Sequence, residues 1–236
     1  MRGARIAAAA VLFLSVAATA CAALRLSEIE QIYREGDAAY EDISEQVKNN
    51  PQEINFEALR AINKNAAAWL YCPGTAIDYP VMKTDDYSYY LTHLPDGTEN
   101  ANGSLFIDYN CSPDFNSRLT VVYGHHMKSG AMFGSLKGYK AQSYYDEHPY
   151  MYLYMPQGYY RVELLYGCVI GAGQWRERAF MYEQNIQALL TYAARNTTFR
   201  SGAAHSEEDR VIALSTCSYE FDGARYVVIG VLRADR

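Results

Sequence analysis

Short apolar runs separated by turn-forming residues constrain the fold of this chain more than any other feature. The separators include Pro73-Gly74, Gln157-Gly158 and Asp222-Gly223, and such residues favour tight turns. Runs of this length and spacing are typical of a β-sandwich or a β-barrel. The 22 tyrosines support this, because aromatic side chains suit half-buried strands. The expected strands are Trp69–Tyr71, Ile77–Met82, Ser104–Asp108, Thr120–Tyr123, Met151–Met155, Tyr159–Ile170, Val211–Leu214 and Tyr226–Leu232.

Helical periodicity is found in three stretches. Residues 26–48 carry apolar side chains at helical spacing among charged ones, which predicts one amphipathic helix, or two divided at Gly36. A second helix is expected over Phe56–Asn63, and a third interrupts the late strands over Glu183–Arg195. Two other segments are expected to be loops: Leu91–Ala101 and Gly171–Ala179.

The N-terminus carries a membrane signal. Arg2 and Arg5 precede an apolar run from Ile6 to Leu24 that only two hydroxyl residues interrupt. A helix of that length spans about 28 Å, close to the thickness of a bilayer core. Small residues before Cys21 also resemble a cleavage site or a lipid-attachment site, so a cleaved signal and a lipoprotein are alternatives. We favour an uncleaved signal anchor over residues 1–25, with the rest of the chain outside the cell.

Composition and charge narrow the class further. Half of the residues are apolar and a fifth are charged, as in a folded globular protein. The net charge of -6 and the lack of a basic stripe give no reason to expect nucleic-acid binding. The predicted organisation is an anchor over 1–25, a helical lead-in over 26–65 and one β-rich domain over 66–236.

The cysteines leave several states open. Outside the cell, thiols commonly form disulfides. If Cys21 lies in the membrane, the other four allow three pairings or none. No Cys-x-x-Cys pair occurs, so a thiolate zinc site is not expected, and the glycines match neither a dinucleotide nor a P-loop spacing. The five cysteines are Cys21, Cys72, Cys111, Cys168 and Cys217.

One cysteine lies where chemistry is plausible. Cys217 closely follows an expected strand, and a catalytic thiol needs a base and a group that stabilises an oxyanion. His125 and His126 follow another strand, after Gly124. Adjacent residues on a strand point to opposite faces, which favours one functional imidazole over a two-histidine metal centre. Arg225 opens the last strand and could donate hydrogen bonds to an oxyanion.

The spacing between Cys217 and Arg225 gives this hypothesis a structural test. A two-residue turn at Asp222-Gly223 would pair Cys217 with Val228 and place Cys217 and Arg225 on opposite faces of the sheet. A shared site needs a loop or a bulge over 218–224, and we predict the loop. The plainer alternatives are a core or disulfide-bonded cysteine, solvated histidines and a surface ion pair of Arg225, which would be worth little.

Three segments carry a resemblance to a known family. They are WLYCPGTAIDYPVMKTDDYSYYLTH (69–93), YGHHMKSGAMFGSL (123–136) and LSTCSYEFDGARYVV (214–228). Together they resemble the matching parts of class B sortases, over roughly residues 30 to 235 and in the same order. The resemblance implies a mainly β fold: a sortase-like eight-stranded β-barrel with N-terminal helices and an inserted helix between late strands.

The resemblance also implies a function and its residues. Sortases are Gram-positive cysteine transpeptidases of the cell surface. The family's Tyr-Gly-His motif falls on His125 and not His126, its cysteine on Cys217 and its arginine on Arg225. Ala213 departs from the family's Thr-Leu-x-Thr-Cys pattern, where a threonine is usual.

The implied reaction is acyl transfer without a cofactor or a metal. A sorting signal of the Pro-x-Thr type would be cleaved after Thr, held as a thioester on Cys217, and passed to an amine of a cell-wall precursor or a pilin. The implied location is the cell membrane, with one N-terminal anchor and an extracellular catalytic domain. Two alternatives remain: a secreted cysteine peptidase or amidase that uses water as acceptor, and a non-enzymatic surface β-barrel protein.

Overall fold

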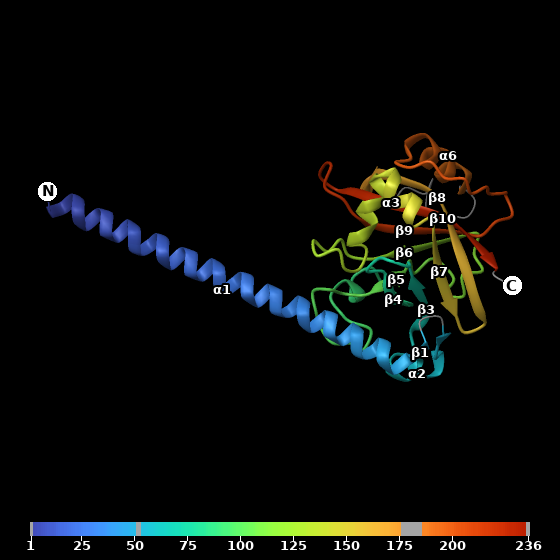
Figure 1. The fold of residues 1–236 in the computed structure, drawn as a ribbon, viewed down its shortest axis with the longest axis horizontal. Coiled ribbons are helices and arrows are strands. Elements are labelled where there is room, and N and C mark those ends of the chain that lie inside the picture. Colours follow the sequence, from blue (N-terminus) through green and yellow to red (C-terminus); the bar gives the residue numbers. More distant parts are fainter. Residues whose placement is uncertain (1, 51–52, 176–185, 235–236) are drawn as a thin grey trace.

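A closed β-barrel forms the body of the molecule (Figure 1). The computed structural model describes residues 2–50, 53–175 and 186–234. The strands follow one another around the barrel in the order β10-β8-β7-β3-β4-β5-β6-β9. Their bounds are β3 (Ala66–Tyr71), β4 (Asp78–Met82), β5 (Leu105–Ile107), β6 (Leu119–Tyr123), β7 (Tyr150–Met155), β8 (Gly158–Gly171), β9 (Val211–Cys217) and β10 (Ala224–Ala234).

The eight-stranded barrel that the family resemblance implies is therefore confirmed. Most of its strand pairs are antiparallel, but β4 pairs with β5 and β6 pairs with β9 in parallel. Parallel strands end at the same edge of a sheet, so the residues that follow β6 and β9 meet at one rim of the barrel. This pairing decides where the candidate site lies.

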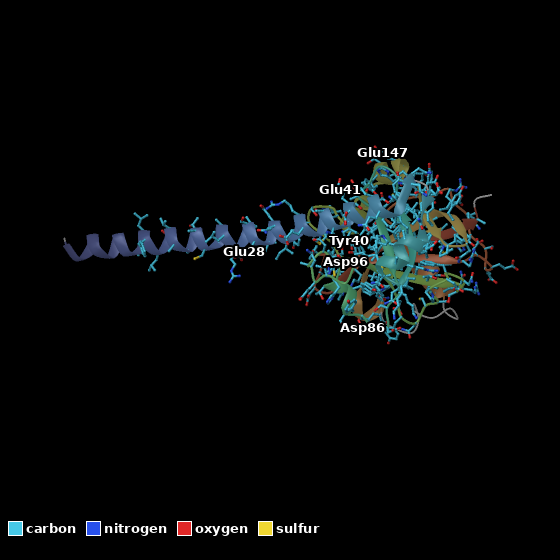
Figure 2. The ribbon with its side chains drawn as sticks, turned by 90° about the horizontal axis from the view of Figure 1, so that it is seen from below. Glu28, Tyr40, Glu41, Asp86, Asp96 and Glu147 are labelled. Atoms are coloured by element: carbon cyan, nitrogen blue, oxygen red, sulfur yellow. The ribbon has the colours of Figure 1, made fainter. Side chains whose placement is uncertain are left out.

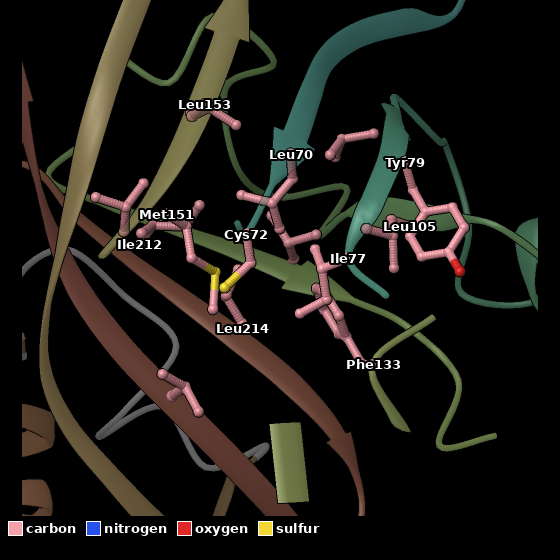
Figure 3. Packing of buried hydrophobic residues seen from close by; sticks show 14 of the residues in the cluster. Leu70, Cys72, Ile77, Tyr79, Leu105, Phe133, Met151, Leu153, Ile212 and Leu214 are labelled. Carbon is pink, nitrogen blue, oxygen red and sulfur yellow. The ribbon is translucent and has the colours of Figure 1, made fainter. Parts of the chain in front are cut away.

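The barrel has apolar packing on both of its faces. Along β10, Val228 and Leu232 belong to the interior cluster, whereas Val227, Ile229 and Val231 belong to an outer cluster. A strand that is buried on both faces has a nearly continuous apolar sequence, as β10 does. In the interior, side chains from strands and loops far apart in the chain pack together (Figure 3), among them Leu70, Leu105, Met151, Leu153, Ile212 and Leu214.

The outer cluster is covered by the inserted helix. Helix α6 (Ile186–Asn196) buries Ile186, Leu189, Leu190 and Ala193 in the cluster that contains the outer face of β10. This confirms the helix predicted over Glu183–Arg195, although residues 183–185 lie outside the described residues. The helix contacts β8 as well, so it braces the barrel beside the strand that carries Arg225.

A single long helix leads into the barrel. Helix α1 (Arg2–Val47) runs through Gly36 without a break, so the alternative of two helices is wrong. Gly36 instead permits close packing, because a Cβ there would lie 2.5 Å from the Asn102 side chain. Figure 2 shows Glu28 on the projecting part of the helix and Tyr40 against the domain. The Tyr40 hydroxyl is buried and donates to the Gly103 carbonyl at 2.5 Å.

Short elements complete the lead-in and the loops. The sequence correctly predicted α2, but the loop expected over Gly171–Ala179 is wrong over residues 172–175, which form a short helix; residues 176–179 lie outside the described part. Burial of Trp175 holds that turn against the barrel. The short elements are β1 (Lys48–Asn50), β2 (Glu53–Ile54), α2 (Phe56–Ile62), η1 (Tyr89–Leu91), η2 (Gly134–Lys140), α3 (Gln142–Glu147) and α4 (Ala172–Trp175).

Candidate active site

The parallel pair of β6 and β9 brings His125 and Cys217 to the same rim of the barrel. Tyr123 pairs with Ser215, and each candidate residue follows two positions later. Two hydrogen bonds hold the strand ends together: the Gly124 amide donates to the Ser215 carbonyl at 3.2 Å, and the Thr216 hydroxyl donates to the Gly124 carbonyl at 2.8 Å. The His125 imidazole and the Cys217 thiol are therefore attached to neighbouring strand ends that hydrogen bonds hold in place.

The pairing of β9 with β10 places Arg225 directly opposite Cys217. Opposite residues in an antiparallel pair point to the same face of the sheet. The predicted loop is confirmed over residues 218–223, and the two-residue hairpin, which would have paired Cys217 with Val228, is excluded. Within the loop the Ser218 amide donates to the Ala224 carbonyl at 2.9 Å, which fixes where β10 begins.

All three candidate side chains line one cavity of about 630 Å³. A volume of this size is typical of a ligand pocket. Ser215 and Thr216 contribute to the wall near Cys217, and the aromatic side chains of Tyr87, Tyr109, Tyr123 and Trp175 form much of the rest. No pattern in the sequence predicted this aromatic wall, although Tyr109 follows directly after an expected strand.

A backbone carbonyl orients His125. Its Nε2 lies 2.6 Å from the Leu91 carbonyl oxygen. A carbonyl can only accept a hydrogen bond, so Nε2 carries the proton. The other ring nitrogen, Nδ1, is then the one that can take up or release a proton during a reaction.

His126 has different surroundings. It is absent from the cavity wall, and its ring packs edge-on against Tyr219 with 5.1 Å between centroids. Burial lowers the pKa of His126, although a hydrogen bond with the Cys217 backbone opposes the shift. The two histidines thus point to different environments, as the alternation of side chains along a strand predicts.

Arg225 lines the cavity without a carboxylate partner among the described residues. Its Nη1 donates to the Ala224 carbonyl at 3.0 Å, which leaves other guanidinium donors for a ligand. The surface ion pair considered as an alternative is not formed, because Glu220 pairs with Lys140. The Lys140 ammonium also lies 5.2 Å from the ring centroid of Tyr226, which ties the 218–223 loop to η2 and β10.

The five cysteines, all among the described residues, form no disulfide with one another, so the disulfide alternatives are not realised. Burial raises the pKa of Cys72, and it raises the pKa of Cys168 to about 12, which makes both poor nucleophiles at neutral pH. Cys217, in contrast, is partly exposed and lines the cavity. Within residues 2–50, 53–175 and 186–234, no group of three or more His, Cys, Asp or Glu side chains could hold a metal ion.

Comparison with known proteins was made by family model, by sequence and by fold. No family model matches the chain. Sortase B of Listeria monocytogenes serovar 1/2a is 29% identical over 211 residues, which cover 88% of this chain and 83% of that protein. Sortase B of Staphylococcus aureus is 28% identical over 177 residues, which cover 74% of this chain and 72% of that protein.

Solved structures agree with the sequence relatives. A Bacillus anthracis sortase B in complex with AAEK1 superposes with a TM-score of 0.77 at 24% identity, and the match covers 88% of this chain and all of that chain. The barrel and the relatives together indicate a cysteine transpeptidase of the sortase type. Within that type, the comparisons confirm the resemblance to class B sortases predicted from the three sequence segments.

Proposed function

We propose that the chain cleaves a sorting signal of the Pro-x-Thr type after Thr and transfers the acyl group, through a thioester on Cys217, to an amine. The observation that carries this proposal is the shared cavity of His125, Cys217 and Arg225. Acyl transfer needs a nucleophile, a proton carrier and an oxyanion-stabilising group, and these three side chains supply one of each. A Staphylococcus aureus sortase B–substrate complex is among the fold neighbours, with a TM-score of 0.70 at 24% identity, which supports substrate binding by a barrel of this kind.

The first half-reaction forms the thioester. The Cys217 thiolate attacks the carbonyl carbon of Thr, and the carbonyl oxygen becomes an oxyanion. The free Arg225 guanidinium donors stabilise that oxyanion. The C–N bond then breaks, and protonated Nδ1 of His125 gives its proton to the departing amine. At this stage the enzyme holds the acyl group and a neutral imidazole.

The second half-reaction reverses these roles. An incoming amine attacks the thioester, and neutral Nδ1 of His125 accepts the proton that the amine loses. The C–S bond breaks, and Cys217 leaves as a thiolate. Nε2 keeps its proton throughout, because it donates that proton in a hydrogen bond to the Leu91 carbonyl. Only Nδ1 needs to change its protonation state.

The same proposal includes an uncleaved membrane anchor. Helix α1 contains the stretch Val11–Val47, which is long and apolar enough to cross a membrane. Apolar side chains in the N-terminal part of this stretch are exposed: Phe13 is 74% exposed and Val11 67%. A bilayer would cover them, and the leading arginines favour an extracellular catalytic domain.

The acceptor distinguishes this function from the peptidase alternative. The test incubates a Pro-x-Thr-Gly peptide with the protein, with and without a glycine-type amine, and quantifies both products by mass spectrometry. A transpeptidase forms the amide product at the expense of the hydrolysed peptide as the amine concentration rises. If the ratio of amide product to hydrolysed peptide does not change with the amine concentration, the result would support a secreted peptidase or amidase instead.

A further inference from the structure

A buried carboxylate lies behind the aromatic wall of the cavity. Asp108 follows β5 and is 1% exposed. Its Oδ1 accepts from the Asn110 amide at 2.9 Å and from the Asn110 side chain at 3.0 Å. Its Oδ2 accepts from the Tyr87 and Tyr123 hydroxyls, each at 3.0 Å. Four donors therefore saturate the two oxygens of one carboxylate.

The four hydrogen bonds suit a carboxylate at Asp108. All of its partners are donors, and a carboxylate that only accepts needs no proton of its own. Burial, and then the charge of Asp108, raise the pKa of Tyr87 and of Tyr123, so both phenols remain protonated donors. Among the described residues, no Lys, Arg or His forms an ion pair with Asp108. The result is a buried negative charge held by neutral groups alone.

The wall between this charge and the cavity is aromatic. Tyr87 and Tyr109 meet edge to face with 4.6 Å between ring centroids, and Tyr87 and Tyr123 do so at 6.0 Å. Tyr109 is 49% exposed and Tyr87 is 40% exposed, so ring surface is available to a ligand. Aromatic faces attract cations, and rings grouped around a cavity are the usual means of binding an ammonium group. A carboxylate behind the rings adds to the same attraction.

We propose that Tyr87, Tyr109 and Tyr123, backed by Asp108, form a subsite for a primary ammonium group. The subsite lies close to the proposed reaction centre, since Tyr123 and His125 are two residues apart, about 7 Å of extended chain. The identity of the ligands of this subsite rests on the proposed acyl-transfer function. Two sources carry this group: a lysine at the variable position of the sorting signal, and the amine of the acceptor before it is deprotonated.

Binding to a Cys217→Ala variant separates the subsite from catalysis, because no turnover is needed. Calorimetry compares two matched pairs of ligands: Pro-Lys-Thr-Gly with its acetyl-lysine form, and Gly-Gly-Gly with its N-acetylated form. We expect the cationic member of at least one pair to bind about tenfold more tightly than its acetylated partner. The pair that shows this difference identifies the source of the ammonium group. Equal affinities within both pairs, or no binding by either cationic ligand, would overturn the subsite.

Variants at the wall test the residues themselves. Tyr109→Leu removes the most exposed ring and should abolish the preference for the cation, whereas Tyr109→Phe keeps the ring and should retain it. Asp108→Asn on its own removes the charge and should reduce the preference for the cation, while the neutral ligands bind as before. A preference that survives both Tyr109→Leu and Asp108→Asn would refute the assignment. Failure of the proposed function is a separate result, seen as no thioester on Cys217 in the unmodified protein.

Discussion

The position of His125 depends on a glycine that lies close to its ring, Gly103. Gly103 has φ +58°, and a Cβ there would lie 2.6 Å from the Tyr90 carbonyl oxygen, 2.8 Å from the Leu91 carbonyl oxygen and 3.0 Å from Cδ2 of His125. The Leu91 carbonyl is the group that accepts from Nε2 of His125. The Gly103→Ala substitution therefore pushes on both the imidazole and the carbonyl that orients it.

The expected cost has two parts. A left-handed backbone conformation costs a residue with a Cβ about 1–2 kcal/mol. Contacts shorter than 3 Å with backbone oxygens add an overpacking cost of about 1–3 kcal/mol. Gly130→Ala is the matched control, because Gly130 has φ +92° and a methyl group added there would meet no atom within 4 Å. The two variants share the first cost, so Gly103→Ala should be less stable than Gly130→Ala by about 1–3 kcal/mol.

Thermal unfolding and kinetics measure the two consequences. For a domain of this size the stability difference corresponds to a Tm lower by roughly 2–12 °C in Gly103→Ala than in Gly130→Ala. A shift of about 1 Å in a catalytic group can cost about 100-fold in rate, so kcat/KM for peptide cleavage should fall toward that value in Gly103→Ala only. Equal Tm and equal kcat/KM in the two variants would refute the claim that Gly103 leaves room for His125 and its carbonyl.

Two further predictions concern neighbouring groups. His125→Ala should lower kcat by about 10²–10⁴-fold, whereas His126→Ala should change it far less; equal losses in steady-state assays would contradict the choice of His125. Although partial burial alone would raise the pKa of Glu220, hydrogen bonds from Lys140 and Ser218 lower it to about 2, so its ionised form is stabilised by folding. The Tm advantage of the wild type over Glu220→Gln should therefore be full above about pH 4.5 and disappear as the pH falls toward 2; an advantage that persists at pH 2 would show that the Lys140–Glu220 pair is not its source.

The strands were predictable because their residues carry the pattern directly. The run over β10 is apolar at successive positions, and the structure shows that alternate residues pack into two different clusters. The loop after Cys217 was also predictable, since side-chain alternation makes a shared site with Arg225 incompatible with a two-residue turn. In both cases the regular alternation of side chains along a strand was enough to predict the structure.

Other features depend on contacts that a single sequence does not encode. Gly36 is compatible with a helix break, and only its packing against Asn102 shows that the glycine permits close approach. The short helix over 172–175 depends on burial of Trp175, which needs the finished barrel. Similarly, nothing in the sequence distinguishes the buried Asp108 from exposed acidic residues, so the charge behind the cavity wall was not predicted.

The proposed acyl transfer is tested most directly by identifying the residue that holds the acyl group. The protein is mixed with a Pro-x-Thr-Gly peptide without an added amine, quenched in acid and mapped by mass spectrometry. We expect an adduct of the peptide acyl group on Cys217, lost in Cys217→Ala and retained in Cys111→Ala, where the replaced thiol is also partly exposed. An adduct on another cysteine, or cleavage that persists in Cys217→Ala, would contradict it.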